Sequence, residues 1–253
     1  MTRTPRILVA CEYSGTVRDA FAARGWDAWS CDLRPSETPG NHHMGDVTPL
    51  LKQPWDLVIA HPTCRILTNS GARWLYEKWT PAEREVAAEK GVTLQGHSRR
   101  RDEQRWAELD EAAEFFNLFK TANAPFIAIE NPVMHGHAVK LVGGKATQFV
   151  QPYQFGHHES KRTGLRLFNL PPLTPTDDVE TAMRELPKKV WNKCHYMSPG
   201  PDREKERSRT AVGIAQAMAD QWGPVVEDHV ANMPEPLLFC DEVNSEFRRE
   251  PAA

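Results

Sequence analysis

Three largely apolar segments, each about the length of one β-strand and each followed by polar residues, limit most strongly what this chain can fold into. They are RILVACE from Arg6, WDLVIAH from Trp55 and APFIAIEN from Ala124. Strands that are apolar along their whole length are buried on both faces, which is typical of parallel sheets covered by helices. The sequence therefore predicts an α/β fold in which a mostly parallel sheet carries helices on both faces.

The segments between these strands have helical patterns. TVRDAFAARG predicts a helix closed by Gly25, and RTAVGIAQAMADQWG predicts a last helix ended by Gly223. One apolar stripe at spacings of three and four falls on Trp106, Leu109, Ala113, Phe116 and Phe119. We expect a single domain over 1–230, with a charged, poorly periodic, lid-like insertion at 70–105 and a weakly ordered tail at 231–253.

Composition limits the functional classes. A formal net charge of -3 gives no overall attraction to nucleic acid, so such binding would have to use local basic patches. The sequence has neither an apolar run of eighteen residues nor a signal peptide, and we expect a cytoplasmic protein without a membrane segment. Five cysteines, an odd number without a CxxC pair, argue against a disulfide framework, and no histidine spacing predicts a metal site.

Polar residues with useful chemistry stand where the predicted strands end. Glu12 to Gly15 stand at and after the end of RILVACE, the first strand. Asp32 ends a second predicted strand, DAWSCD from Asp27, and Asp46, in GDV from Gly45, follows a third. His61 to Cys64 stand at and after the end of WDLVIAH, the fourth strand, and Glu130 follows the apolar part of APFIAIEN, the fifth. Ligand sites in open parallel sheets form at the carboxyl ends of the strands. We therefore expect these side chains to lie at one edge of the sheet.

The acids after the second and third strands indicate a nucleoside cofactor. Asp32 lies 17 residues beyond Gly15, the spacing at which a carboxylate can bind both ribose hydroxyls. Asp46 can accept a hydrogen bond from the adenine amino group. Because the first turn has no GxGxxG to hold a pyrophosphate, a nucleoside without phosphates, such as S-adenosylmethionine, fits better.

Cys64 and Glu130 form the predicted catalytic pair. Cys64 follows Pro62 and Thr63 at the mouth of a strand, where a thiolate can be exposed and stabilised, and Glu130 closes the neighbouring strand. A nucleophilic thiolate beside a carboxylate suits attack on an electron-poor ring whose nitrogen needs a hydrogen-bond partner.

This ordered set resembles the cytosine-C5 DNA methyltransferases. The segment from His61 to Cys64 resembles their Pro-Cys motif, Glu130-Asn131-Pro132 their Glu-Asn-Val motif, and 162–168 their arginine motif. Cys11 to Gly15, Asp32 and Asp46 resemble the cofactor motifs in the same order, and 209–223 resembles the last helix. The chain is also similar to short bacteriophage-encoded members, so the expected compartment is then the host cytoplasm. Thr63, Arg65 and Gly164 depart from the family pattern.

The resemblance implies a Rossmann-like class I S-adenosylmethionine-dependent fold with a seven-stranded sheet. It implies that Cys64 adds to C6 of cytosine, that Glu130 binds N3 and the exocyclic amine, and that methyl passes to C5 of a base flipped out of duplex DNA. Arg166, with Arg162 and Lys161 nearby, would hold the target nucleotide. The implied cofactor-binding residues are Cys11, Glu12, Ser14, Gly15, Asp32, Leu33, Asp46, Val47 and Pro62.

Several alternatives stay open. The region expected to recognise DNA, 169–207, is short, which also permits methylation of RNA or of a free pyrimidine nucleotide. Thr63 and Gly164 favour a degenerate methyltransferase fold that only binds DNA, whereas retention of both Cys64 and Glu130 favours an enzyme. Transfer of another group from a related sulfonium cofactor is a third alternative. The sequence gives no prediction of oligomeric state or recognition site.

Overall fold

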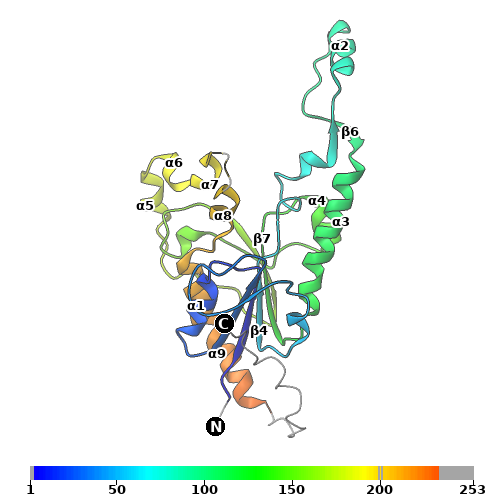
Figure 1. The fold of residues 1–253 in the computed structure, drawn as a ribbon. Coiled ribbons are helices and arrows are strands. Elements are labelled where there is room, and N and C mark those ends of the chain that lie inside the picture. Colours follow the sequence, from blue (N-terminus) through cyan, green and yellow to red (C-terminus); the bar gives the residue numbers. More distant parts are fainter. Residues whose placement is uncertain (1–2, 199, 201, 234–253) are drawn as a thin grey trace, which may run out of the picture.

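A seven-stranded sheet forms the centre of the protein (Figure 1), with the strand order β3-β2-β1-β4-β7-β9-β8. The computed structural model describes residues 3–198, 200 and 202–233. The strands are β1 (Arg6–Ala10), β2 (Asp27–Asp32), β3 (Asn41–Met44), β4 (Leu57–Ala60), β7 (Phe126–Pro132), β8 (Gln148–Val150) and β9 (Thr163–Phe168). The first five are parallel neighbours, and β9 runs antiparallel to β7 and β8. This Rossmann-like α/β sheet confirms the predicted fold class.

Helices cover both faces of the sheet because the central strands are apolar on both. Ile7 and Val9 of β1 pack with α1 (Thr16–Ala22) and α9 (Val212–Asn232) on one face. Leu8 and Ala10 pack on the other, with α3 (Glu103–Leu118) and with α4 (Gly136–Leu141). The alternation of side chains along a strand produces this division. Burying each large aliphatic side chain contributes about 1.5–3 kcal/mol.

The last helix continues beyond Gly223, the residue at which the sequence predicts its end. α9 continues past Gly223 and Pro224 to Asn232, because Val226 and Val230 extend its buried face. A Cβ at position 223 would lie 2.6 Å from the guanidinium of Arg24, so this glycine permits close packing instead of ending the helix. The predicted tail, 231–253, therefore begins inside α9, and its part from 234 onward lies outside the described residues.

The predicted insertion at 70–105 forms a projecting arm (Figure 1). Its two antiparallel strands are β5 (Tyr76–Lys78) and β6 (His97–Arg101), and α2 (Pro81–Glu89) lies between them at the tip. A capping box at Thr80 begins α2. Where the arm meets α3, the indole nitrogen of Trp106 donates to the Leu75 carbonyl at 2.9 Å.

A second lobe stands across from the arm (Figure 1) and contains most of the short helices. It comprises α5 (Glu180–Glu185), α6 (Lys188–Trp191), α7 (Lys193–Tyr196) and α8 (Asp202–Ser208). Single 3-10 turns complete the fold: η1 (Leu50–Lys52), η2 (Ala72–Leu75), η3 (Phe119–Thr121) and η4 (Pro152–Gln154). The lobe corresponds to the region 169–207 and rises, like the arm, above the carboxyl edge of the parallel strands. None of the helices in the described part of the chain has the length and apolar character needed to cross a membrane.

Candidate active site

The ends of β4 and β7 place a histidine beside the predicted carboxylate. These strands are parallel neighbours with Ala60 opposite Ile129, so the next residues, His61 and Glu130, are adjacent. Nδ1 of His61 donates a hydrogen bond to Oε2 of Glu130 at 3.0 Å, and the two side chains are 8% and 14% exposed. Nε2 of His61 is buried and has no hydrogen-bond partner among the described residues. The place of His61 at the end of a strand is visible in the sequence, but no function was predicted for this residue.

Cys64 lies in the loop that leaves β4, outside both apolar cores, and is half-buried. Burial raises the pKa of its thiol to about 11, and the negative charge of Glu130 adds to this rise, whereas Lys161 and Arg207 lower it in part. Cys64 follows β4, and Glu130 lies toward the end of β7, the neighbouring parallel strand, so both are at the same edge of the sheet. At neutral pH the thiol is protonated, and any change that neutralises Glu130 favours the thiolate.

Glu130 is ionised at neutral pH despite its burial. Desolvation by itself would raise the pKa of this carboxyl group, but the hydrogen bond and charge of His61, with the charge of Lys161, lower the pKa overall. A buried carboxylate fixed on one oxygen by an imidazole can use its other oxygen to bind a polar ligand.

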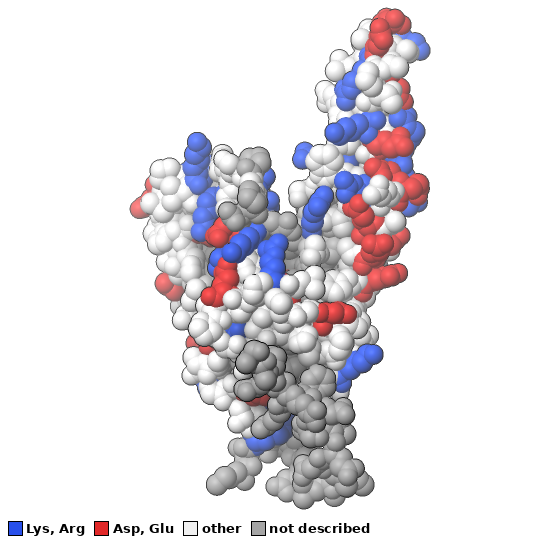
Figure 2. Space-filling view, viewed as in Figure 1, with Lys and Arg blue, Asp and Glu red and all other residues white. Residues whose placement is uncertain are grey.

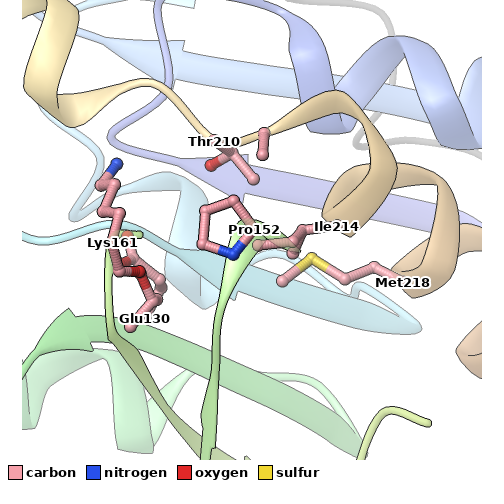
Figure 3. Close-up of a pocket in the computed structure, with 8 residues that line it drawn as sticks. Glu130, Pro152, Lys161, Thr210, Ile214 and Met218 are labelled. Atoms are coloured by element: carbon pink, nitrogen blue, oxygen red, sulfur yellow. The ribbon is translucent and has the colours of Figure 1, made fainter. Parts of the chain in front are cut away.

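A small pocket adjoins Glu130 on the α9 side of the sheet (Figure 3). It is narrow, with room inside for about one water molecule. Glu130, Lys161 and Thr210 line its polar end, while Ile214 and Met218 lie toward the other end. Pro152, Thr163 and Ala211 complete the lining. Nζ of Lys161 donates to the carbonyl of Arg209 at 2.7 Å, so the segment between α8 and α9 helps to hold this cation near the carboxylate.

Arg166 does not join Cys64 and Glu130. Leu165 is the residue of β9 that lies opposite Glu130, so the side chain of Arg166 points to the other face of the sheet. There its guanidinium donates to the carbonyls of Val142, Gly144 and Lys145 after α4. These bonds give Arg166 a structural function, and we do not retain the nucleotide contact predicted for it.

Two other positions of the arginine motif have different surroundings. Arg162 is exposed and lies 4.3 Å from the ring centroid of Phe149, a cation–π contact. Gly164 stands where the family has its first arginine. A Cβ at position 164 would approach the Asn131 carbonyl to 3.0 Å and the Ala146 Cβ to 2.9 Å, so this position has no room for a larger side chain.

The turn after β1 is built around Glu12. Its buried carboxylate accepts hydrogen bonds from the amides of Val17 at 2.7 Å and Arg18 at 3.1 Å, and the hydroxyl of Ser14 donates to it at 3.3 Å. The carboxylate thus satisfies amides at the beginning of α1. Of the predicted cofactor residues, Glu12 and Ser14 therefore shape the turn with their side chains.

The backbone conformations of Cys11 and Gly15 determine the course of the same turn. Both have left-handed backbone conformations, with φ of 59° and 73°. At Gly15 a Cβ would lie only 2.2 Å from Oγ1 of Thr38. Cys11 is half-buried, and burial, followed by the charge of Asp32, raises the pKa of its thiol. The turn and the end of β2 therefore lie close together, as the cofactor hypothesis requires.

The remaining cofactor candidates lie at the ends of β2, β3 and β4. Asp32 and Asp46 each accept backbone amides two residues ahead, from Arg34 and Thr48, both at 2.9 Å. In both acids the bond uses Oδ1, which leaves Oδ2 without a hydrogen-bond donor among the described residues. The backbone bond from Thr48 lowers the pKa of Asp46, followed by the bond from its hydroxyl.

Apolar groups accompany these acids. Leu33 is 79% exposed directly after Asp32, and Met44, opposite Asp32 in the sheet, is 64% exposed. Val47 and Pro62 are buried. Two carboxylate oxygens open to a ligand beside exposed apolar side chains fit the hydroxyls and flat ring of a nucleoside. Within the described ranges, no three His, Cys, Asp or Glu side chains are grouped so that they could hold a metal ion.

The lobe containing α8 is bound to the turn after β1, a link that the sequence did not reveal. The hydroxyl of Tyr13 donates to the Lys205 carbonyl at 2.6 Å. Glu37 forms ion pairs with Lys205 at 2.6 Å and Arg209 at 2.7 Å. These contacts place the beginning of α9, which lines the pocket, next to the candidate cofactor turn.

Comparisons with known proteins add little to this geometry. No known family's sequence pattern matches the chain, and no curated protein matches it. Among solved structures, it is similar to a proposed DNA modification methyltransferase encoded within an E. coli prophage, with a TM-score of 0.36 and 14% identity. The likeness covers 65% of this chain and 46% of the other, so this chain spans less than half of that protein. A similarity of this size does not assign an activity, and the functional case depends on the site.

Proposed function

We propose that this protein is an S-adenosylmethionine-dependent methyltransferase that modifies C5 of cytosine in DNA through a covalent bond between Cys64 and C6. The observation that carries the proposal is that a half-buried thiol, in the loop after β4, and a largely buried carboxylate, on the neighbouring β7, lie at the same edge of the sheet. The charge of Glu130 acts on the pKa of Cys64, and His61 fixes one carboxylate oxygen. A protein that only binds DNA has no need for this arrangement.

Glu130 is the group that binds the base. His61 occupies Oε2, which leaves Oε1 to face N3 and the exocyclic amine of cytosine. A hydrogen bond to these nitrogens stabilises the charge that develops when C6 is attacked. Lys161, whose ammonium lowers the pKa of both Cys64 and Glu130, keeps the site electrostatically favourable for anions.

The protons balance if Glu130 transfers the thiol proton to the ring. Cys64 Sγ bonds to C6, its proton ends on N3 by way of Glu130, and the ring electrons form a double bond between C4 and C5. Once C5 is methylated, its proton leaves to water, the C5–C6 double bond forms as Sγ departs, and Glu130 returns the N3 proton to the sulfur. The resting thiol pKa of about 11 thus falls as the carboxylate charge is neutralised by the base.

The residues present fit S-adenosylmethionine. Asp32 would bind the ribose, Asp46 the adenine amino group, and Leu33 the face of the adenine, beside the turn from Cys11 to Gly15. When bound, this cofactor supplies an electrophilic methyl group on a sulfonium. A target base in a duplex has to leave the stack to reach Glu130, which costs a few kcal/mol.

Transfer of label from tritiated S-adenosylmethionine tests the proposal. Full-length protein is incubated with duplex DNA, single-stranded DNA, RNA of the same sequence and deoxycytidine monophosphate. We expect label in duplex DNA, none with Cys64→Ala, and wild-type transfer with the matched variant Cys194→Ser, which can keep its hydrogen bond to Glu159.

The other outcomes distinguish the alternatives. Label found only in RNA or only in the mononucleotide would show that this molecule, and not DNA, is the substrate. Label transfer that persists in the Cys64→Ala variant would overturn the covalent mechanism. Binding of DNA and cofactor without transfer to any substrate would support a degenerate DNA-binding protein.

A further inference from the structure

The cations of β6 differ in whether they are paired. Arg100 forms ion pairs with Glu77 at 2.6 Å and Glu83 at 2.5 Å, so its charge is neutralised locally. Arg99, the preceding residue of β6, is exposed and has no ion-pair partner among the described residues. Arg99 therefore leaves a positive charge available to a ligand.

Other cations of the arm gather around a tryptophan. The guanidinium of Arg73 lies 4.7 Å from the ring centroid of Trp74, and Nζ of Lys78 lies 5.8 Å from it. His97, which is opposite Lys78 in the ribbon and two residues before Arg99, packs its edge against the same ring at 5.5 Å. We call Arg73, Lys78 and Arg99 the arm cations. All three are exposed, and contact with the Trp74 ring positions two of them, Arg73 and Lys78.

The root of the arm is fixed next to the catalytic candidates. The amide of Asn69, five residues after Cys64, donates to the Val133 carbonyl, three residues after Glu130, at 3.1 Å. The amide of Asp102 donates to the Leu75 carbonyl at 3.0 Å. Both strands of the arm therefore rise from the edge of the sheet that carries the site.

The surface between the arm and the opposing lobe is hollowed (Figure 2). Lys and Arg side chains lie along the edge of the arm that borders this hollow, and Asp and Glu gather on its outer side. Further Lys and Arg side chains lie on the facing lobe. A hollow with cations on both walls above the site matches the charge of a nucleic acid backbone.

We infer that the arm is one wall of the substrate cleft and that the arm cations bind the phosphate backbone of duplex DNA. Trp74 supports this choice over base stacking, because Arg73 and Lys78 lie against its ring and the ring of His97 packs roughly perpendicular to it. A ring so occupied positions cations and is poorly available to a base, whereas single strands are usually bound by open aromatic platforms. Phosphate contacts of this kind position a duplex without reading its sequence. The inference rests on the proposed function, since it names how the same site holds DNA.

A matched pair of neighbouring substitutions tests this inference. Arg99→Gln and Arg100→Gln remove the same charge from adjacent residues of β6, of which only Arg100 is held in ion pairs. The affinity of full-length protein for a fluorescein-labelled, mixed-sequence 24-base-pair duplex is measured by anisotropy over a range of salt concentrations. We expect Arg99→Gln to weaken binding several-fold and to reduce the slope of log K against log salt by about 0.9, the value for one phosphate contact. Arg100→Gln should leave both unchanged.

A triple variant enlarges the effect. Replacing Arg73, Lys78 and Arg99 by Gln should weaken duplex binding roughly 10- to 100-fold near 0.1 M salt and reduce the slope by about 2.7. Unchanged binding of S-adenosylmethionine shows that the sheet is intact.

The outcomes separate this inference from the proposed function. Wild-type protein that fails to bind the duplex would overturn the DNA substrate itself. The arm would not be a duplex-binding wall if the wild type binds the duplex and the Arg99 and Arg100 variants bind it with equal affinity. The same would follow if the Arg99 variant lost affinity only for a single strand of the same sequence.

Discussion

Replacing His61 by Phe tests whether the imidazole holds Glu130 in its ionised form. The substitution removes a hydrogen bond of 3.0 Å between two side chains that are 8% and 14% exposed. A hydrogen bond to a charged group contributes about 1.5–3 kcal/mol. Without this donor, desolvation is opposed by less, so the pKa of Glu130 should rise in the variant.

The sign of the effect follows from the lowered pKa of Glu130 in the wild type. A carboxyl group with a lowered pKa stabilises the fold above its unfolded-state pKa, and this contribution is lost as the pH falls through the folded pKa. His61→Phe should therefore reduce the free energy of unfolding by about 1.5–3 kcal/mol at pH 7.5, and by less at pH 4.5.

Urea unfolding at both pH values measures the difference. His61→Asn, which can still donate to the carboxylate, should recover part of the loss, and His61→Phe should cost less when Glu130 is already Gln. If His61→Phe lowers the free energy of unfolding by the same amount at pH 7.5 and 4.5, and with either Glu or Gln at position 130, the loss comes from packing alone. The imidazole would then not hold Glu130 in its ionised form.

Three further substitutions test local roles, each with unfolding free energies from urea titration. Glu12→Gln should lose about 1–2 kcal/mol because the carboxylate satisfies two amides at the start of α1, and a change below about 0.3 kcal/mol would contradict this capping function. Gly164→Ala should lose about 1–3 kcal/mol, since its Cβ would press on the Asn131 carbonyl, whereas an equally stable variant would show that β9 has room to move. Arg166→Met should lose about 1–3 kcal/mol while methyl transfer per folded molecule stays the same; the opposite pattern, stable but inactive, would restore a substrate contact.

The central strands could be predicted from the sequence because their signal is local. Buried parallel strands are apolar on both faces, and β1, β4 and β7 show this in consecutive residues. Elements exposed on both sides lack such a signal. The edge strand β3, with the sequence NHHM, forms within a stretch that reads as a loop, and the ribbon of the arm lies in a segment whose charges hide its pairing.

The end of α9 shows a different limit. A glycine in a helical pattern indicates a helix end, but Gly223 is needed for its contact with Arg24, which is distant in the sequence. Whether a glycine ends a helix or packs against a neighbour depends on the tertiary structure, which the local pattern does not contain.

The site was predictable as far as strand ends determine it. Parallel strands end at the same edge, so Cys64 and Glu130 could be expected near each other. The register between strands decides the rest. The register of β9 with β7 places Leu165 opposite Glu130, and a shift of one residue would place Arg166 there instead. The register of β4 with β7 makes His61 the hydrogen-bond partner of Glu130. Register depends on pairing between distant segments, so neither result could be derived from motif spacing.

Capture of the covalent intermediate directly tests whether Cys64 forms a bond with C6 of cytosine. Duplex DNA containing 5-fluorocytosine is incubated with S-adenosylmethionine and the full-length protein, and the products are analysed by intact-mass spectrometry under denaturing conditions. Fluorine at C5 cannot leave as a proton does, so the thioether to C6 persists. We predict a protein–DNA adduct that carries one methyl group. The adduct should map to Cys64 and be absent in the Cys64→Ser variant. Methylation of ordinary cytosine without any adduct on the fluorinated DNA, or an adduct that maps to another cysteine, would contradict it.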